Sequence, residues 1–546
     1  MKIFLAQLNP TVGDIANNLK LALNYYSKAK AVKADIIVFS ELFICGYSPQ
    51  DLVKLQSFLQ ECELAIMELT QATKDSDTAI LVGSPIVDSN NIYNAALLLD
   101  KGEIIAKSYK YHLPNYKEFS EKRIFSTAEL PRVINFRDKK IAMPICEDIW
   151  QNSDLISHLK MQGVELLLVM NASPYTVNKM KLRHNLVRNI TTKISVPLVY
   201  VNQIGAQDGL IFDGGSFVYN ATGDCILQLA QFKEDTACYD LDINNKINYE
   251  NLILNQEEAN YQACVLGLRD YILKNNFKKV IVGLSGGIDS ALSTVMAVDA
   301  IGAENVSCYM LPYKYTSDDS LIDAEISAKL LGVDYHVIPI NQAVEASLTS
   351  LSSLFAGYQS DTTEENIQSR IRGVFLMALA NKFNSLLITT GNKSELAVGY
   401  ATLYGDMNGA YNPIKDLYKT EVYKLARWRN ANYIDGLLGI KGKVIAENIL
   451  TKEPSAELRD NQKDTDSLPP YDILDKILYK LIEEEKSLKQ IISDGYNETI
   501  VAKIENLLYL SEYKRSQAAI GTKLTERSLG IDRQYPITNS YRDKFR

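Results

Sequence analysis

The sequence predicts an α/β protein of two domains, the first a sandwich of sheets flanked by helices and the second a doubly wound parallel sheet. Over residues 1–243, short apolar runs alternate with helical patterns and with hairpins that have glycine-containing turns. Over residues 259–546, strands and helices follow one another in strict alternation, which is typical of a parallel sheet. Residues 244–258 between them are polar, and we expect a linker there.

Each strand is predicted from a short apolar run that ends in polar or turn-forming residues. In the first half these runs are 3–8, 36–40, 79–83, 141–145, 166–170 and 198–202, and the segments 93–107 and 215–229 are predicted hairpins. In the second half the expected strands are 280–284, 306–311, 335–340 and 386–389, with a helix over 364–383 and a polar, basic tail over 511–546.

Composition excludes several classes of protein. A chain of 546 residues is too long for one ordinary core, and 46% hydrophobic with 23% charged residues is typical of a globular protein. The net charge of −8 argues against nucleic-acid binding, and no apolar run is long enough to span a membrane. Seven dispersed cysteines without a C-x-x-C pair indicate reduced thiols and a cytoplasmic location. Four histidines without metal-ligand spacing argue against a zinc enzyme.

A loop of small residues connects the strand at 280–284 to a helix. In such a loop the backbone N–H groups can converge, and the positive end of the helix adds to them, so the loop suits a phosphate group. No Gly-Lys-Ser/Thr follows, so this is not a Walker A loop, and Asp289 stands where a carboxylate can hold Mg²⁺ on a polyphosphate. A glycine-rich turn without a ligand is the structural alternative. The predicted phosphate-binding residues here are Gly283, Ser285, Gly286, Gly287, Asp289 and Ser290.

The strand at 386–389 supplies further polar groups where it ends. Carboxylates and cations of a metal–phosphate site should arrive from neighbouring strand ends of a parallel sheet. Glu395 is therefore the expected second metal ligand, Thr390 is expected to contact the nucleotide, and Lys393 is expected near phosphate.

Three residues of the first half, Glu41, Lys110 and Cys146, each follow a predicted strand or hairpin. Amide hydrolysis through a thioester needs a thiolate, a base that takes and returns its proton, and a cation for the oxyanion. Cys146, Glu41 and Lys110 can fill these roles in that order. Taken singly, a cysteine beside a strand is usually core filler and a glutamate there pairs with a lysine. We expect Cys45 and His112 to be structural.

This constellation resembles the carbon–nitrogen hydrolase (nitrilase) superfamily, which is known for a Glu-Lys-Cys triad. The likeness extends to Glu118 and Glu121 and to the Asn-Ala-Ser-Pro segment at 171–174. It implies a nitrilase-like α-β-β-α sandwich. It also makes Tyr116, Ser173 and Lys179 candidates to bind the amino and carboxylate groups of glutamine.

The Ser-Gly-Gly-Ile-Asp-Ser run resembles the pyrophosphate loop of the ATP pyrophosphatase superfamily, whose members cleave ATP between its α and β phosphates. The segments 399–406, 412–419 and 454–458 resemble NAD synthetases, the last being a mobile loop in that family. The resemblance assigns the dinucleotide, nicotinic acid adenine dinucleotide, to Asn366, Arg370, Asp406, Lys419 and Lys514.

Both halves together resemble the glutamine-dependent NAD⁺ synthetases over essentially the full chain. The resemblance implies that ammonia from glutamine amidates nicotinic acid adenine dinucleotide through an adenylate made from ATP, with Mg²⁺ on Asp289 and Glu395, in a homo-oligomer. Two rivals are a ligase that activates another carboxylate and a hydrolase whose second half only senses nucleotide. The segments 366–372 and 399–419 disfavour the first, and the presence of Asp289 and Glu395 disfavours the second.

Overall fold

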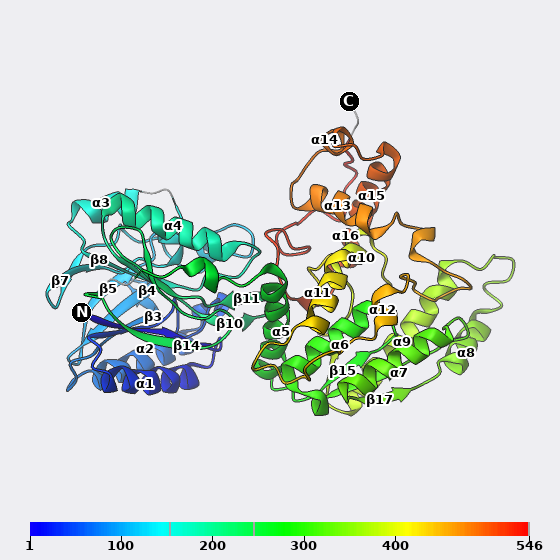
Figure 1. The fold of residues 1–546 in the computed structure, drawn as a ribbon, viewed down its shortest axis with the longest axis horizontal. Helices are drawn as coiled ribbons and strands as arrows, with labels where there is room; N and C mark the ends of the chain where they lie inside the picture. Colours follow the sequence, from blue (N-terminus) through cyan, green and yellow to red (C-terminus); the bar gives the residue numbers. More distant parts are fainter. Residues whose placement is uncertain (152–153, 244–245, 544–546) are drawn as a thin grey trace. The chain divides into compact units, whose positions relative to one another are not determined.

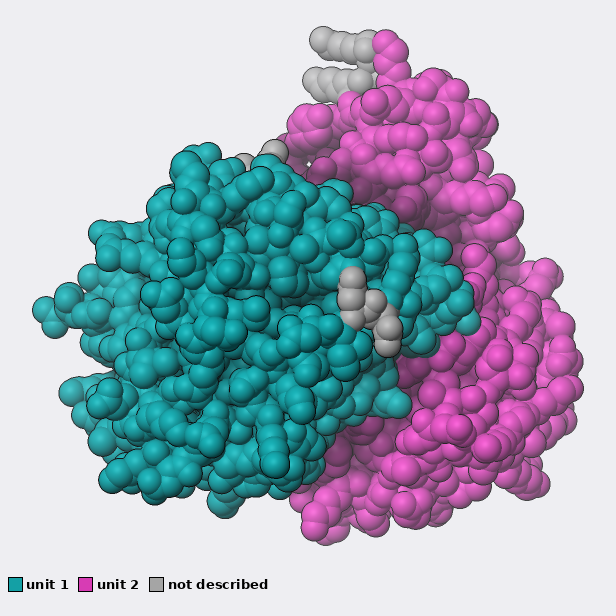
Figure 2. All heavy atoms as spheres, turned by 60° about the vertical axis from the view of Figure 1, so that its left-hand side comes forward, with its two compact units in different colours: residues 1–256 teal, residues 257–546 magenta. Residues whose placement is uncertain are grey.

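The computed structural model describes residues 1–151, 154–243 and 246–543 (Figure 1). It divides into two compact units, Met1–Gln256 and Glu257–Arg546, which Figure 2 distinguishes by colour. Residues 244 and 245, where the predicted linker 244–258 begins, and residues 544–546 of the predicted second domain lie outside the described residues. The limits 1–243 and 259–546 stay predictions.

The first unit contains two six-stranded mixed sheets. One has the order β14-β1-β2-β3-β4-β5, with bounds Asp235–Asp240, Lys2–Gln7, Ile36–Val38, Ala79–Asp88, Asn91–Asp100 and Glu103–Tyr109. The other has the order β13-β12-β9-β8-β7-β6, with bounds Cys225–Gln228, Phe217–Tyr219, Leu198–Asn202, Leu166–Asn171, Lys139–Ala142 and Ile134–Phe136. A separate hairpin joins β10 (Ile204–Gln207) and β11 (Leu210–Asp213).

The first unit has four layers, as the alternating directions of side chains along its strands show. In β1, Ile3 and Leu5 belong to the core between the two sheets, whereas Phe4 and Ala6 pack toward helices α1 (Ile15–Ala31) and α2 (Gln56–Ala72). In β8, Leu168 lies between the sheets, and Val169 packs toward α3 (Asp154–Met161) and α4 (Lys179–Ile194). Successive side chains of a strand point to opposite faces, so both sheets are buried on both sides. The predicted α-β-β-α sandwich is confirmed (Figure 1).

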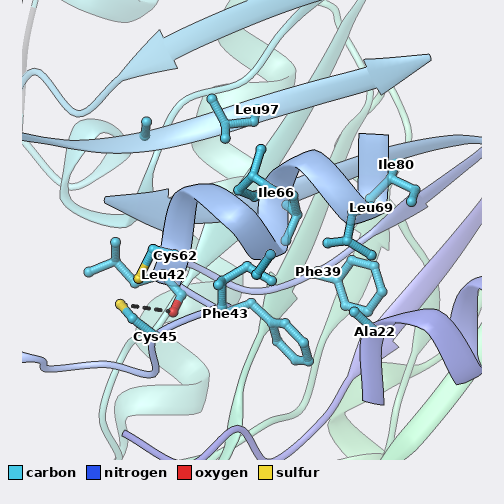
Figure 3. Packing of buried hydrophobic residues seen from close by; sticks show 14 of the residues in the cluster. Ala22, Phe39, Leu42, Phe43, Cys45, Cys62, Ile66, Leu69, Ile80 and Leu97 are labelled. Carbon is cyan, nitrogen blue, oxygen red and sulfur yellow. Dashed lines mark hydrogen bonds between the residues drawn. The ribbon is translucent and has the colours of Figure 1, made fainter. Parts of the chain in front are cut away.

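Figure 3 shows part of the core between the first sheet and its helices. Cys45 is fully buried in it near Cys62 of α2, and its thiol lies 3.6 Å from the carbonyl oxygen of Leu42. All seven cysteines of the chain are free thiols. The prediction that Cys45 is a packing residue is confirmed.

The second unit is built on one six-stranded sheet in which every paired strand is parallel. Its order is β17-β16-β15-β18-β19-β20, with bounds Asp334–Val337, Val306–Met310, Val280–Gly283, Leu386–Ile388, Tyr411–Asn412 and Ile520–Gly521. Ile281 packs on one face with residues of α8 (Asn341–Leu351) and α9 (Thr362–Lys382), while Val280 and Val282 point to the other face and are also buried. Helices α6 (Ile288–Ile301) and α7 (Asp318–Leu331) contact β15, β16 and β17. The predicted doubly wound parallel sheet is confirmed.

The remaining helices of the second unit are α5 (Gln256–Lys274), α10 (Lys393–Val398), α11 (Lys419–Ala431), α12 (Glu447–Thr451), α13 (Tyr471–Ile482), α14 (Leu488–Ser493), α15 (Glu498–Leu510) and α16 (Glu512–Arg515). Residues of α10, α13, α14 and α15 form an apolar core of their own. The segment 511–546 is more than a polar tail, because it contains α16 and then β20, which extends the sheet beside β19. Across the described ranges, no helix is both long and apolar enough to cross a lipid bilayer.

Candidate active sites

The three predicted catalytic residues of the first unit lie just beyond ordered strands. Glu41 is in the turn after β2, Lys110 directly follows β5, and Cys146 opens the short 3-10 helix η3 (Cys146–Ile149) after β7. The Lys110 Nζ lies 2.7 Å from Glu41 Oε1, and both side chains are fully buried. The strand ends therefore bring this buried carboxylate and this buried ammonium together, and their catalytic roles stay predictions.

The carboxylate of Glu41 is oriented by two further donors. The Asn94 amide donates to Oε1 at 2.8 Å, and the backbone N–H of Ala172 donates to Oε2 at 3.1 Å. Asn94 lies on β4 and Ala172 directly follows β8. Hydrogen bonds to both oxygens fix the orientation of this carboxylate.

Lys110 is shared with a second carboxylate, that of Glu121, at 2.8 Å. Glu121 also accepts a hydrogen bond from the Tyr47 hydroxyl at 2.8 Å. Burial opposes the charge of Lys110, but Glu121 and Glu41 more than offset it and raise the pKa of this lysine well above its ordinary value. The ammonium is thus permanently charged and available to stabilise an oxyanion.

Cys146 is the predicted nucleophile. It is 8% exposed and adopts a φ of 42°, a left-handed conformation that is costly for a non-glycine residue and is often found at functional sites. Burial and next the charge of Glu41 raise the pKa of its thiol well above the ordinary value. The thiol is therefore protonated at rest and requires a neighbouring base to react.

Asp148 is a buried residue that sequence reasoning missed. Its carboxylate accepts from the backbone N–H groups of Ile145 at 2.9 Å, Tyr111 at 3.0 Å and His112 at 2.8 Å. It thus ties the turn that carries Cys146 to the segment that follows Lys110. Its position two residues after Cys146 was visible in the sequence, but its partners were not.

The three candidates for glutamine binding make contacts of different kinds. The Tyr116 hydroxyl donates to Glu147, the neighbour of Cys146, at 2.9 Å. The Lys179 ammonium lies 4.3 Å from the ring centroid of Trp150. The Ser173 hydroxyl accepts from Nε of the buried Arg183 at 3.3 Å. Their roles stay predictions.

The second unit contains a cavity of about 670 Å³ at the carboxyl ends of β15, β16 and β18. Its lining includes nearly every site residue predicted for this half: Gly283, Ser285, Gly286, Gly287, Asp289, Ser290, Asn366, Thr390, Glu395, Asp406, Lys419 and Lys514. Gly286 has a φ of 81°, and a Cβ there would lie 2.3 Å from the carbonyl oxygen of Ser320. Only glycine fits at this position of the loop.

Lys419 connects the two predicted metal ligands. Its ammonium donates to Asp289 and lies 3.1 Å from Glu395 Oε1. The Asn392 amide donates to the other oxygen of Asp289 at 2.9 Å. Burial opposes its charge, but Asp289 and Glu395 raise the pKa of Lys419 above its ordinary value. The two carboxylates therefore face one point that already attracts a cation.

These carboxylates fit Mg²⁺ in the chemistry of their donor set. Mg²⁺ prefers oxygen ligands and is commonly held by one or two carboxylates together with phosphate oxygens and water. Within the described residues no third His, Cys, Asp or Glu completes a metal cluster. Asp289 and Glu395 would therefore share the ion with the phosphates of a nucleotide.

Two of the predicted dinucleotide residues, Asn366 and Asp406, are connected through Thr402 in the wall of this cavity. Asp406 accepts from the N–H of Thr402 at 2.8 Å and from the Ser369 hydroxyl at 3.2 Å, and Asn366 accepts from the Thr402 hydroxyl at 2.8 Å. Burial raises the pKa of Asp406 above its ordinary value. The side of the cavity that carries Asp406 is thus built by the loop after α10 and by α9.

Lys514 and Arg370 differ in their relation to the cavity. The Lys514 ammonium donates to the carbonyl oxygens of Gly399 at 2.8 Å and Ala401 at 2.7 Å, so it supports the same loop. Arg370 does not line the cavity, and its Nε donates to the carbonyl oxygen of Leu403 at 3.2 Å. Arg372, on the same helix, does line it.

The expectation that Lys393 lies near phosphate is wrong. Its side chain is fully buried, with Nζ 2.8 Å from Asp416 and 2.5 Å from Glu483. Lys393 is the first residue of α10, and its side chain points into the protein between these carboxylates. These buried ion pairs stabilise the loop after β18 on the side that faces the protein interior.

A loop that includes Glu457 forms another part of the cavity wall. Glu457 accepts from the N–H of Ser317 at 3.2 Å and from the hydroxyls of Ser317 and Ser320 at 2.7 Å each. Lys452 donates to the Ser320 hydroxyl at 2.6 Å. Ser317 is the N-cap of α7, so Glu457 lies at the positive end of that helix. The sequence indicated this loop but not the contact.

Comparisons with known proteins agree on both halves of the chain. Residues 2–249 match the carbon-nitrogen hydrolase family, and residues 260–518 match the NAD synthase family. The glutamine-dependent NAD(+) synthetase of Rhodobacter capsulatus is 44% identical over 100% of this chain and 99% of its own length. The protein of the same name from Thermotoga maritima is 41% identical over 100% and 99%.

Among solved structures, the glutamine-dependent NAD⁺ synthetase of Acinetobacter baumannii in complex with adenosine diphosphate is similar with a TM-score of 0.77 and 38% identity. The match covers 100% of this chain and 99% of that one. The likeness therefore extends over the carbon-nitrogen hydrolase half and the NAD synthase half alike.

Proposed function

The chain belongs to the glutamine-dependent NAD⁺ synthetases, and we propose that it amidates nicotinic acid adenine dinucleotide with nitrogen taken from glutamine. The observation that carries this proposal is that each unit contains one buried, charged constellation suited to one half of the reaction. A cysteine with a base and a cation lies in the first unit, and an anion loop with two carboxylates and a lysine lies in the second.

In the first unit, Cys146 attacks the side-chain amide carbon of glutamine. Glu41 takes the thiol proton as the C–S bond forms, and Lys110 stabilises the oxyanion. Glu41 then gives that proton to the departing ammonia, and the C–N bond breaks. Water, deprotonated by Glu41, releases glutamate from the thioester and restores the thiol. Tyr116, Ser173 and Lys179 are proposed to hold the amino and carboxylate groups of glutamine.

In the second unit, the carboxylate of nicotinic acid adenine dinucleotide attacks the α-phosphorus of ATP, and pyrophosphate leaves. The Ser285–Gly286–Gly287 turn and the ammonium of Lys419 line the same cavity and are proposed to stabilise the developing negative charge. Ammonia then attacks the acyl carbon of the adenylate, and AMP leaves with the electron pair of the broken C–O bond. Asn366, Arg370, Asp406 and Lys514 are proposed for the dinucleotide, and Thr390 for ATP.

Asp289 and Glu395 would hold Mg²⁺, which neutralises charge on the pyrophosphate when it is bound. The support is that both carboxylates already converge on one ammonium group. A cytoplasmic location is proposed from the seven free cysteines, since reduced thiols persist in a reducing compartment. A homo-oligomer is proposed from the family resemblance alone.

The test is a single assay with nicotinic acid adenine dinucleotide, ATP, Mg²⁺ and glutamine, in which NAD⁺ and AMP are both measured. Equal amounts of NAD⁺ and AMP are expected. Glutamate without NAD⁺ would leave only the amidase, and AMP from another acceptor would point to the rival ligase.

A further inference from the structure

Lys419 occupies a position that electrostatics alone makes unfavourable. It is the first residue of the 13-residue helix α11, where the backbone presents its positive end, and its side chain is only 4% exposed. A lysine is normally favoured at the opposite end of a helix. Something else must therefore hold this ammonium in place.

The compensation comes from the two carboxylates of the proposed metal site. The ammonium contacts Asp289 and Glu395 together, and these side chains are 16% and 17% exposed. The buried Asp464 carboxylate also acts on the ammonium and helps to raise the pKa of Lys419. A point surrounded by negative charge at low exposure needs a cation, because unpaired buried charge is costly.

An ammonium and a divalent cation cannot occupy this point together. Both would contact the same carboxylate oxygens, and at a separation of a few ångströms their repulsion is large in a partly dehydrated cavity. Binding of a metal ion therefore requires the Lys419 side chain to move. The side chain lies in the same cavity as the Ser285–Gly286–Gly287 turn, where the phosphates of a nucleotide are proposed to bind.

We propose that Lys419 is an internal counterion of the metal site, which pairs with Asp289 and Glu395 in the metal-free protein and is exchanged for Mg²⁺ when the site is loaded. The displaced ammonium then pairs with phosphate oxygens of the nucleotide. This inference rests on the proposed Mg²⁺ site. Metal and nucleotide accordingly bind better together than either does alone, because each removes the cost of displacing Lys419 for the other.

The exchange is tested by the affinity of the nucleotide-free protein for Mn²⁺, a spectroscopic substitute for Mg²⁺, measured from the EPR signal of the free ion. Lys419→Met keeps the length of the side chain but removes its charge. We expect this variant to bind Mn²⁺ at least tenfold more tightly than the unaltered protein. The matched control is Lys452→Met. Lys452 lines the same cavity but contacts Ser320 rather than Asp289 and Glu395, so the Mn²⁺ affinity of this control should change less than threefold.

Equal or weaker binding by Lys419→Met would overturn the exchange. A similar gain in both lysine variants would also overturn it, because it would show only the effect of net charge. Asp289→Asn separates this failure from failure of the metal site itself. If Asp289→Asn leaves Mn²⁺ binding unchanged, the ion binds elsewhere and the proposed Mg²⁺ ligands are wrong. If Asp289→Asn loses Mn²⁺ binding, the metal ligands are correct and only the exchange is wrong.

Removing the ammonium leaves two carboxylates facing each other, so folding of Lys419→Met must be followed by circular dichroism with and without Mn²⁺. A variant that folds only with the metal supports the exchange, because the metal then replaces the missing charge. A variant that does not fold under either condition is replaced by Lys419→Gln. If that variant also fails to fold with saturating Mn²⁺, the lysine is an irreplaceable structural residue and the exchange is overturned.

Discussion

Glu41 and Glu121 both bind one ammonium group, that of Lys110, with Nζ–Oε1 distances of 2.7 and 2.8 Å. One positive charge cannot neutralise two buried carboxylates, so the cluster of Glu41, Glu121 and Lys110 favours binding an additional proton. Burial raises the pKa of Glu121 to about 7, Lys110 opposes this shift, and the charge of Glu41 adds to it. We therefore expect this buried cluster to take up or release a proton near neutral pH.

This titration should be visible in the stability of the first unit. An acid whose folded-state pKa is raised contributes stability that is full below its unfolded pKa and is lost as pH rises through the folded value. For Glu121 the window runs from 4.5 to about 7. The side chain of Glu121→Gln cannot ionise. The difference in free energy of unfolding between this variant and the unaltered protein should therefore shift in favour of the variant by roughly 3 kcal/mol from pH 4.5 to pH 8.

The measurement is urea unfolding at several pH values, followed by tryptophan fluorescence. The chain has only two tryptophans, so a Trp428→Phe background leaves Trp150 to report the first unit. The control is Glu129→Gln, whose carboxylate is 89% exposed, and it should show a pH dependence close to that of its parent. A constant difference between Glu121→Gln and its parent at all pH values would show that Glu121 titrates normally.

Cys146→Ala should separate the two nitrogen sources. Without the thiol no thioester forms, and NAD⁺ synthesis from glutamine should fall by at least about 1,000-fold, since a covalent nucleophile is lost. Synthesis from ammonium chloride should stay within about threefold. The readout is NAD⁺ formed with each nitrogen source at the same ATP concentration.

Cys45→Ala is the matched control for that experiment, because this thiol is also buried in the first unit but packs between apolar side chains. We expect it to retain use of glutamine and to lose about 1 kcal/mol of stability from the small cavity. Equal loss of glutamine use in both variants would argue that Cys146 has no special role. Loss of ammonia-dependent synthesis in Cys146→Ala would argue against a nucleophile dedicated to the amide.

Sequence reasoning was most successful where the signal is local. Short apolar runs predicted the central strands of both sheets of the first unit and of the parallel sheet of the second, but not the edge strands β6 and β14. The 285–290 run predicted a phosphate loop, and the structure places this run in the wall of a cavity at a strand end. The partners of a polar side chain depend on distant segments, so Asp148, Glu457 and the buried pairing of Lys393 were missed. Strand β20 was missed because two residues have no periodicity, and its pairing with β19 is decided by the tertiary fold.

Asp289→Asn should impair the second half of the reaction with either nitrogen source. The amide keeps the size of the side chain but removes a charge that would hold Mg²⁺ on the pyrophosphate. We expect NAD⁺ formation from glutamine and from ammonia to fall together, by at least about 100-fold. Raising Mg²⁺ should recover part of the loss. Activity unchanged by the substitution would mean that the metal is held by other groups.

The Glu457 carboxylate should hold its loop against the N-terminus of α7. It accepts three hydrogen bonds from Ser317 and Ser320, whereas Glu453 on the same loop is 69% exposed and pairs with Lys463. Hydrogen bonds to a charged group contribute about 1.5–3 kcal/mol, and exposed ion pairs contribute about 0–1 kcal/mol. In Glu457→Gln, amide hydrogen exchange over residues 452–463 should therefore become at least tenfold faster, and in Glu453→Gln it should change less than threefold. Equal rates in the two variants would show that the loop is held by its backbone rather than by Glu457.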